Sequence, residues 1–227
     1  MERKRPAARL EGRARATPNP QEPPEKPGGT RKRILDAAIR EFAEKGYDNA
    51  STNSIVDAAG TSKGLLFHYF GSKDALYLAA LDHCIEFQIE YFLKNLGELP
   101  ADLVERVLTW GELKVKMLLE EPLMFKMAVG GIDGNPKGLN RELTARMARI
   151  TERLMPAFLS GIDFSSLREG ISPQKAIEFV FLVINAASEK FLAATKDSPD
   201  RGLSALNSAL EEIKEYGEFL RTGLYRH

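Results

Sequence analysis

The sequence predicts an all-α protein in two parts, an N-terminal domain of three helices and a larger helical domain behind it. Three observations support this fold class. Apolar residues recur three and four positions apart along most of the chain, which is the period of a helix packed on one side. Beyond residue 77 there is no strand-like alternation and no glycine loop of the kind that binds nucleotides. Prolines and glycines fall between the periodic segments, where they end one helix before the next begins.

The composition is that of a globular protein with a buried core, since 43% of the 227 residues are hydrophobic. No apolar run approaches the roughly 20 residues that a membrane span needs, and the N-terminus is charged where a secretory signal would be apolar. We therefore expect a cytoplasmic protein with no membrane partner. The single cysteine, Cys84, excludes an intrachain disulfide framework, and with three scattered histidines we expect no metal site and no cofactor.

Residues 1–29 are predicted to form a disordered, basic, proline-rich tail, because six prolines and a terminal Gly28-Gly29 pair cannot sustain a helix or a strand. The tail holds seven basic and four acidic residues, whereas the chain after residue 77 holds 18 basic and 22 acidic ones. The front of the molecule is thus basic relative to the back, as in a protein that meets a polyanion at one end. The tail either adds non-specific attraction to phosphates or is an extension without a role.

Residues 30–77 predict a long first helix followed by two short ones. Serine and threonine are good N-caps, and glycine is the usual residue just past a helix C-terminus. Two short helices joined by a tight glycine turn and packed on a longer helix form a helix-turn-helix, whose second helix enters the major groove of DNA. The expected boundaries, in chain order, are Thr30, Lys45-Gly46, Ser51 or Thr52, Gly60, and Thr61 or Ser62.

The third helix, about residues 62–70, carries an unusual run of aromatic residues. Leu66 and Phe70 lie four apart and are expected to face the core, whereas Lys63 and Phe67 lie four apart on another face. Some of the aromatic side chains are therefore structural and others are presented outward.

Across residues 30–77, many positions match one motif at fixed spacing. They are Gly46-Tyr47, Thr52, Ile55, Ala58-Ala59-Gly60, Ser62-Lys63-Gly64, Leu66, Tyr69-Phe70, Lys73 and Leu76. Together they resemble the signature of the TetR family of transcriptional regulators. The resemblance implies an all-helical homodimer whose N-terminal helix-turn-helix domain, residues 30–77, binds a palindromic operator. It also implies that residues 78–227 form a helical domain for effector binding and dimerisation.

The resemblance further implies a set of DNA-facing positions. Lys73 would place its charge beside the amides that open the next helix, where a phosphate oxygen is well bound. Asn53, Lys63 and His68 have side chains that can reach base edges. Phe67 departs from the tyrosine usual in the family, so it keeps an apolar contact but loses a hydroxyl for phosphate. The full set is Thr52, Asn53, Ser62, Lys63, Gly64, Leu65, Phe67, His68, Tyr69 and Lys73.

The second domain is expected to contain the dimer interface. Helices are predicted at about residues 73–96, 101–120, 122–129, 138–160, 173–195 and 202–224. Residues 176–187 are apolar around nearly the whole helix, so they must be covered on more than one side. The last helix has leucines alternating three and four apart, with a glycine that permits close approach. Packing within one chain is the alternative to a four-helix interface formed by Phe181, Ile184, Leu206, Leu210, Ile213, Gly217 and Leu220.

Bulky apolar residues of the middle helices could line a cavity for an apolar or amphipathic small-molecule effector, although core packing is the alternative for each of them. No motif identifies the ligand. The candidate lining residues are Phe87, Tyr91, Trp110, Met117, Phe125, Met127, Met147, Met155 and Phe158.

These observations predict a repressor that is released from its operator by a small molecule. A ligand-independent DNA-binding or architectural protein is one alternative, and a second domain without a cavity would support it. An enzyme is another, because Asp82, His83 and Cys84 are reactive. Adjacent residues on a helix point about 100° apart, however, so these three cannot form a nucleophile and base pair, and we expect no catalytic residues.

Overall fold

The computed structural model describes residues 29–133, 136, 138–195 and 202–225, without the side chains of 129–133, 184–185, 187–195, 202–210 and 213. Residues 1–28, most of the predicted tail, lie outside the described ranges. Where it is described, the chain is all-α, and its only β-type pairing is a single bridge between Leu167 and Tyr225. The helices are α1 (Thr30–Asn49), α2 (Thr52–Ala59), α3 (Lys63–Phe70), α4 (Lys73–Asn95), α5 (Leu103–Glu120), α6 (Pro122–Asp133), α7 (Asn140–Leu159), α8 (Pro173–Thr195) and α9 (Gly202–Leu224).

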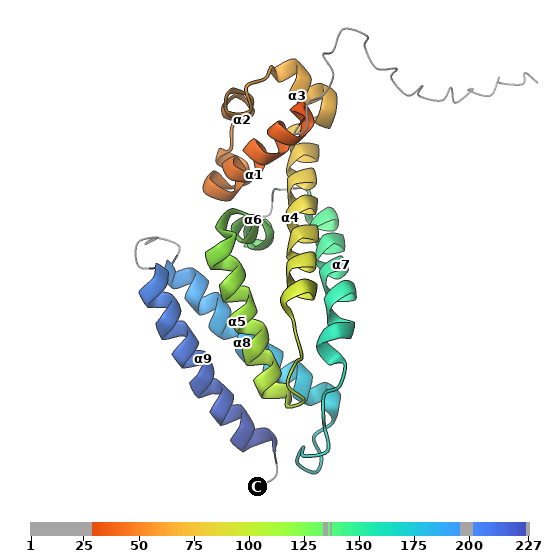
Figure 1. The fold of residues 1–227 in the computed structure, drawn as a ribbon, viewed down its shortest axis with the longest axis vertical. Helices are drawn as coiled ribbons and strands as arrows, with labels where there is room; N and C mark the ends of the chain where they lie inside the picture. Colours follow the sequence, from red (N-terminus) through yellow and green to blue (C-terminus); the bar gives the residue numbers. More distant parts are fainter. Residues whose placement is uncertain (1–28, 134–135, 137, 196–201, 226–227) are drawn as a thin grey trace, which may run out of the picture.

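The N-terminal helices α1, α2 and α3 gather at one end of the molecule, and α4 runs from them into the second domain (Figure 1). There α4 packs against α6 and α7, while α8 and α9 lie together against α5. The predicted boundary at residue 77 falls inside α4. Tyr77 on one side of it and Leu81 on the other belong to the same buried cluster, so a continuous core joins the two domains.

Serine caps define the starts of the helices near that end. Ser51 accepts a hydrogen bond from the Ser54 amide at 3.5 Å, and Ser62 accepts one from the Leu65 amide at 3.3 Å. The structure thus selects Ser51 and Ser62 from the two pairs of candidate caps. The predicted cap at Thr30 is wrong, because Thr30 is already helical and its hydroxyl accepts a hydrogen bond from Arg33 at 3.2 Å.

Two glycines adopt the left-handed region at the expected ends of helices. Gly46 has φ of 70° and interrupts the helical geometry of α1, and Gly60 has φ of 59° at the end of α2. A third expectation fails, since α6 continues through Gly130-Gly131 to Asp133. Glycine costs a helix only about 1 kcal/mol relative to alanine, which does not end a helix by itself.

The second domain has its own buried cluster among α5, α7, α8 and α9. Aromatic rings connect it to the first cluster through Phe92, Trp110, Phe158 and Phe181, whose successive centroids are 5.0, 5.2 and 5.1 Å apart. The buried Arg106 of α5 donates to the Phe158 carbonyl at 2.7 Å and to the Pro100 carbonyl at 2.6 Å, so its donors are used inside the protein. Within the described ranges, no helix is long and apolar enough to cross a membrane.

Candidate DNA-binding interface

Helix α3 is held by its inner face and leaves its outer face free. Leu66 and Phe70 are buried, as expected from their spacing, and they anchor α3 on the core that α1 and α4 share. The tight turn before α3 is closed by the Thr61 amide, which donates to the Val56 carbonyl at 3.0 Å. A short helix fixed in this way presents its remaining residues as one rigid surface.

The ten predicted DNA-facing residues lie on α2, on α3 and at the start of α4. Four of them are half-buried: Thr52, Leu65, Tyr69 and Lys73. The other six are exposed: Asn53, Ser62, Lys63, Gly64, Phe67 and His68. The structure therefore brings the candidates to one end of the molecule and leaves most of them accessible (Figure 1).

Gly64 has no packing role within the chain. A Cβ at this position would meet only the Ser62 hydroxyl, at 3.8 Å, which is an ordinary contact. The backbone there is helical with no positive φ, so alanine would fit the fold and favour the helix. An exposed glycine in such a position suits close approach by another molecule.

Phe67 and His68 form the exposed part of the aromatic run. Phe67 is 38% exposed, which is high for a phenylalanine on a helix that is otherwise well anchored. The His68 and Tyr69 rings form a T-shaped pair with centroids 5.4 Å apart. The aromatic run thus divides as predicted, with Phe70 inside and Phe67 and His68 outside.

Lys73 is positioned by Tyr47, which is not among the ten predicted DNA-facing residues. Its ammonium lies 4.6 Å from the centroid of the Tyr47 ring and 3.5 Å from the Asp48 carbonyl oxygen. Tyr47 in turn donates its hydroxyl to Asp74, and burial, together with this hydrogen bond, raises the pKa of Tyr47 to about 12. The Gly46-Tyr47 pair of the motif was the signal that could have identified Tyr47.

Arg31 is a second residue that sequence reasoning missed. It is exposed at the start of α1, and its guanidinium lies 5.1 Å from the centroid of the Phe70 ring. This contact places a cation beside the C-terminal end of α3. The run Arg31-Lys32-Arg33 at the helix start was the available signal.

The predicted effector residues are part of the core in this structure. Met117, Met127 and Phe158 are buried, and Tyr91 donates its hydroxyl to Glu120 at 2.6 Å. Phe87, Trp110, Phe125, Met147 and Met155 are half-buried and pack against the buried clusters.

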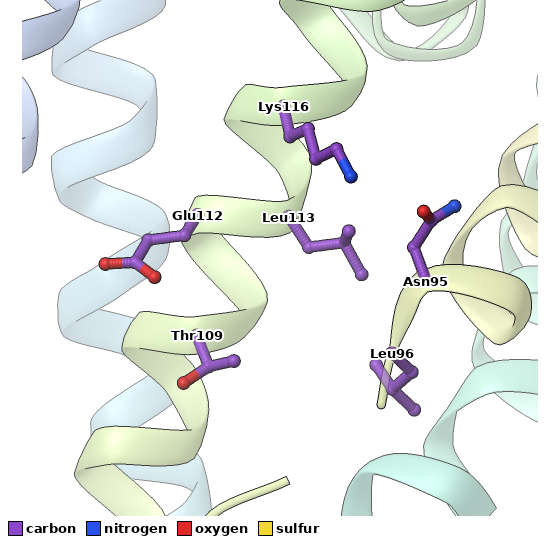
Figure 2. Close-up of a pocket in the computed structure, with 6 residues that line it drawn as sticks. All are labelled: Asn95, Leu96, Thr109, Glu112, Leu113 and Lys116. Atoms are coloured by element: carbon purple, nitrogen blue, oxygen red, sulfur yellow. The ribbon is translucent and has the colours of Figure 1, made fainter. Parts of the chain in front are cut away.

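None of the nine effector candidates lines the described groove, which has a volume of about 190 Å³ and lies between α5 and the end of α4. Figure 2 shows Lys116 and Leu113 of α5 pointing toward Asn95 and Leu96 across this groove. Its volume is below the range of roughly 300–1,000 Å³ typical of drug-sized ligand pockets.

The predicted interface residues that the structure describes are turned inward. Leu220 is buried, and a Cβ on Gly217 would lie 3.2 Å from Leu108 of α5, so the close approach at this glycine is within the chain. Phe181 packs against Phe158. The side chains of Ile184, Leu206, Leu210 and Ile213 lie outside the described residues.

A different apolar face of α8 and α9 is exposed. Phe179 and Leu182 of α8 are 51% and 66% exposed, and Phe219 of α9 is 74% exposed. Large apolar side chains this accessible on two adjacent helices are typical of a surface that another protein covers.

Comparison with known proteins agrees with this geometry. Residues 34–80 match the family model of bacterial regulatory proteins, tetR family. The chain is 46% identical over 55 residues to the HTH-type transcriptional repressor AcnR of Corynebacterium glutamicum, which is 24% of this chain and 29% of that protein. It is 31% identical over 130 residues to an HTH-type transcriptional repressor of Mycobacterium tuberculosis, covering 57% of this chain and 61% of the relative. The matched region thus spans less than two thirds of these relatives.

Solved structures share the fold beyond the N-terminal domain. A TetR transcriptional regulator from Chloroflexus aurantiacus superposes with a TM-score of 0.61 at 21% identity, covering 87% of this chain and 97% of that one. FadR of Bacillus subtilis, solved with stearoyl-CoA, superposes with a TM-score of 0.55 at 19% identity, covering 80% and 96% of the two chains. At these identities the likeness concerns the fold.

Proposed function

Because its residues 34–80 make this chain a member of the TetR family of helix-turn-helix regulators, we propose that it is a transcriptional repressor that binds a palindromic operator as a homodimer. The observation that carries the proposal is the outer face of α3. Leu66 and Phe70 fix the helix from behind, while Lys63, Gly64 and His68 remain accessible. A rigid helix with polar and small residues on its free face is the element that reads base edges in the major groove.

The exposed apolar face formed by Phe179, Leu182 and Phe219 supports the homodimer. A second copy offers the same face, so a two-fold axis beside α8 and α9 would cover both at once. Two α3 helices related by that axis would then read half-sites about one DNA turn, ~34–36 Å, or a multiple of it, apart.

We further propose that a small-molecule effector in the second domain releases the operator. Helix α4 begins with Lys73 at the DNA-facing end and carries Phe87 and Tyr91 toward the other, so movement at one end tilts the other. A dimer must fit two half-sites together, and a small change in their spacing loses contacts. Coupling of this kind is typically worth about 1–3 kcal/mol and must be reciprocal.

Footprinting and light scattering test the first proposal. We expect a symmetric protected site and a dimer at micromolar concentration; a monomer, or protection without symmetry, would contradict it. Release is tested by calorimetric titration of an effector with and without operator DNA, where equal affinities in the two titrations would exclude the switch.

One observation favours a ligand-independent DNA-binding protein as the second candidate. The nine residues suggested for the effector pack in the core, and the described groove between α4 and α5 is small. Under this alternative, operator affinity would not respond to any molecule that binds the second domain.

A further inference from the structure

Helix α5 carries a lysine on the face that otherwise packs into the protein. Residues four before and three after a helical position share its face. For Lys114 these are Trp110 and Met117, and Val107 lies two turns before it on the same side. Met117 and Val107 are buried, whereas the opposite side of α5 exposes Glu105, Glu112 and Lys116. Lys114 therefore lies at the centre of the inner face.

The ammonium of Lys114 has no hydrogen-bond or ion-pair partner among the residues whose side chains are described. Burial lowers the pKa of Lys114, and no carboxylate among the described side chains acts against it. The two buried ionic side chains of the described core, unlike Lys114, both have hydrogen-bond partners. Arg106 donates to backbone carbonyls, and Glu41 accepts from Lys45 and from the Ser51 amide, both at 2.9 Å. An inward cation without a counter-charge is costly unless something else supplies one.

There is also space beside this lysine. Lys114 is only half-buried although it lies on the inner face, so part of its side chain remains accessible. Gly111, one turn before it, is half-buried too, and a Cβ there would meet nothing within 4 Å among the described residues. A missing side chain next to an unpaired cation leaves room for part of a ligand.

We propose that the effector is an apolar molecule with one anionic group, and that Lys114 binds this group while the half-buried Trp110 contacts the apolar part. The inference rests on the proposed release by a small molecule and assigns the charge of that molecule. A carboxylate, a sulfonate or a phosphate would serve, since each offers oxygen acceptors to the ammonium. Binding would supply the counter-charge that none of the described side chains provides at this position.

Two fluorescent probes with the same ring system test the charge requirement. 1-Anilinonaphthalene-8-sulfonate is anionic, and N-phenyl-1-naphthylamine is its neutral counterpart. In titrations of the full-length protein, we expect Lys114→Met to weaken binding of the anionic probe by about 10-fold or more, the usual size for a charge-assisted hydrogen bond. Binding of the neutral probe should stay the same. Lys116→Met, on the outer face of the same helix, is the matched control and should change neither affinity.

Three results would overturn the proposal: no saturable binding of the anionic probe, an unchanged affinity in Lys114→Met, or an equal loss in Lys116→Met, which would place the probe in the groove of Figure 2.

Thermal unfolding provides an independent measurement. Removing an unpaired inward cation should leave the melting temperature of Lys114→Met equal or higher. A fall of several degrees would mean that a carboxylate elsewhere in the chain already pairs with Lys114, and this too would overturn the proposal. Footprinting on the operator distinguishes failure of this proposal from failure of the repressor proposal. An intact footprint together with any of these results would contradict the anionic effector but leave the repressor proposal unaffected.

Discussion

Lys73 and Lys63 carry the same charge in different surroundings, and the surroundings separate their roles. Lys73 is held over the Tyr47 ring at the start of α4, where a phosphate can also meet the helix amides. Lys63 is exposed on the first turn of α3. One position suits backbone attachment and the other suits base reading.

We expect Lys73→Ala to weaken binding to all DNA sequences similarly and to reduce the salt slope by about one unit. Lys63→Ala or His68→Ala should instead change which bases are preferred, with a cost of about 1–3 kcal/mol at the affected position. Binding measured on the operator and on single-base variants at several salt concentrations distinguishes the two. A change in base preference with an unaltered salt slope in Lys73→Ala would reverse these assignments.

Gly64→Ala should stabilise the protein and weaken DNA binding. The added Cβ has room in the chain, and alanine favours a helix by about 1 kcal/mol over glycine. The same methyl group would occupy the space of an approaching DNA backbone. Denaturant unfolding and operator titration measure the two effects. Gly60→Ala is the contrast, because its φ of 59° makes alanine destabilising there. If Gly64→Ala left operator affinity unchanged, Gly64 would not be a contact.

Glu41 makes the stability of the folded protein depend on pH in the acid range. Burial alone would raise its pKa, but the Ser51 amide and Lys45 outweigh burial and hold the pKa below its ordinary value of 4.5. A lowered carboxyl pKa contributes stability above the ordinary value, and that stability is lost as pH falls through the lowered one. We expect Glu41→Gln to cost about 1–3 kcal/mol at pH 7 and to flatten the loss of stability below pH 4.5. Urea unfolding across that range checks this, with Glu44→Gln as an exposed control; parallel pH curves for Glu41→Gln and wild type would refute it.

At the scale of elements, an ion-pair network joins α4 to α7. Asp82 accepts from Arg146 at 2.7 Å and from Arg149 at 2.8 Å, and Glu86 accepts from Arg153 at 2.9 Å. These side chains are partly exposed, so each pair alone contributes little. As a network they hold the middle of α4 against α7.

Replacing both carboxylates, Asp82→Asn with Glu86→Gln, should cost about 1 kcal/mol in low salt and less at 1 M salt, where screening is strong. Urea unfolding at the two salt concentrations measures this. Asp36→Asn is the control: it removes a single ion pair with Lys32 that is more exposed than the network, so it should change stability by less. An equal loss at both salt concentrations would mean that packing, and not charge, joins these helices.

Helix positions were largely predictable because their signals are local. A serine cap acts on an amide three residues away, so the sequence narrowed each start to two adjacent candidates, of which Ser51 and Ser62 are the caps. The predicted cap at Thr30 was wrong because threonine also occurs within the first turn of a helix, where its hydroxyl can form another hydrogen bond, here with Arg33. The predicted end of α6 at residue 129 was wrong because a pair of glycines weakens a helix without ending it.

At the scale of the whole molecule, the outward face of α8 and α9 was the least predictable feature. Residues 176–187 are apolar around nearly the whole helix, so no polar stripe in the sequence marks which side faces the solvent. Phe181 was expected outside and packs on Phe158, while Phe179 and Leu182 are exposed. The packing of α5 and α7 against these helices decides which residues of α8 face inward.

The exposed face gives a test of assembly. Leu182→Glu with Phe219→Glu should raise the dimer dissociation constant by about 100-fold or more, because burying such side chains contributes about 1.5–3 kcal/mol each and symmetry repeats every change. Light scattering over a concentration series measures this. Leu119→Glu, at an exposed position on α5, should leave the dimer intact. A dimer unaffected by the double change would place the interface elsewhere.

The single core that runs from α1 through α4 has a consequence for exchanging parts between regulators. A cut at residue 77 would divide α4 and separate Tyr77 from Leu81, which are buried in the same cluster. It would also separate α1 from α6, which pack against each other (Figure 1). A chimera that joins residues 30–77 to the C-terminal domain of another regulator must therefore bring matching surfaces of α4 and α6 with it. An exchange that leaves α4 and α6 behind would thus expose apolar surface at both ends of the cut.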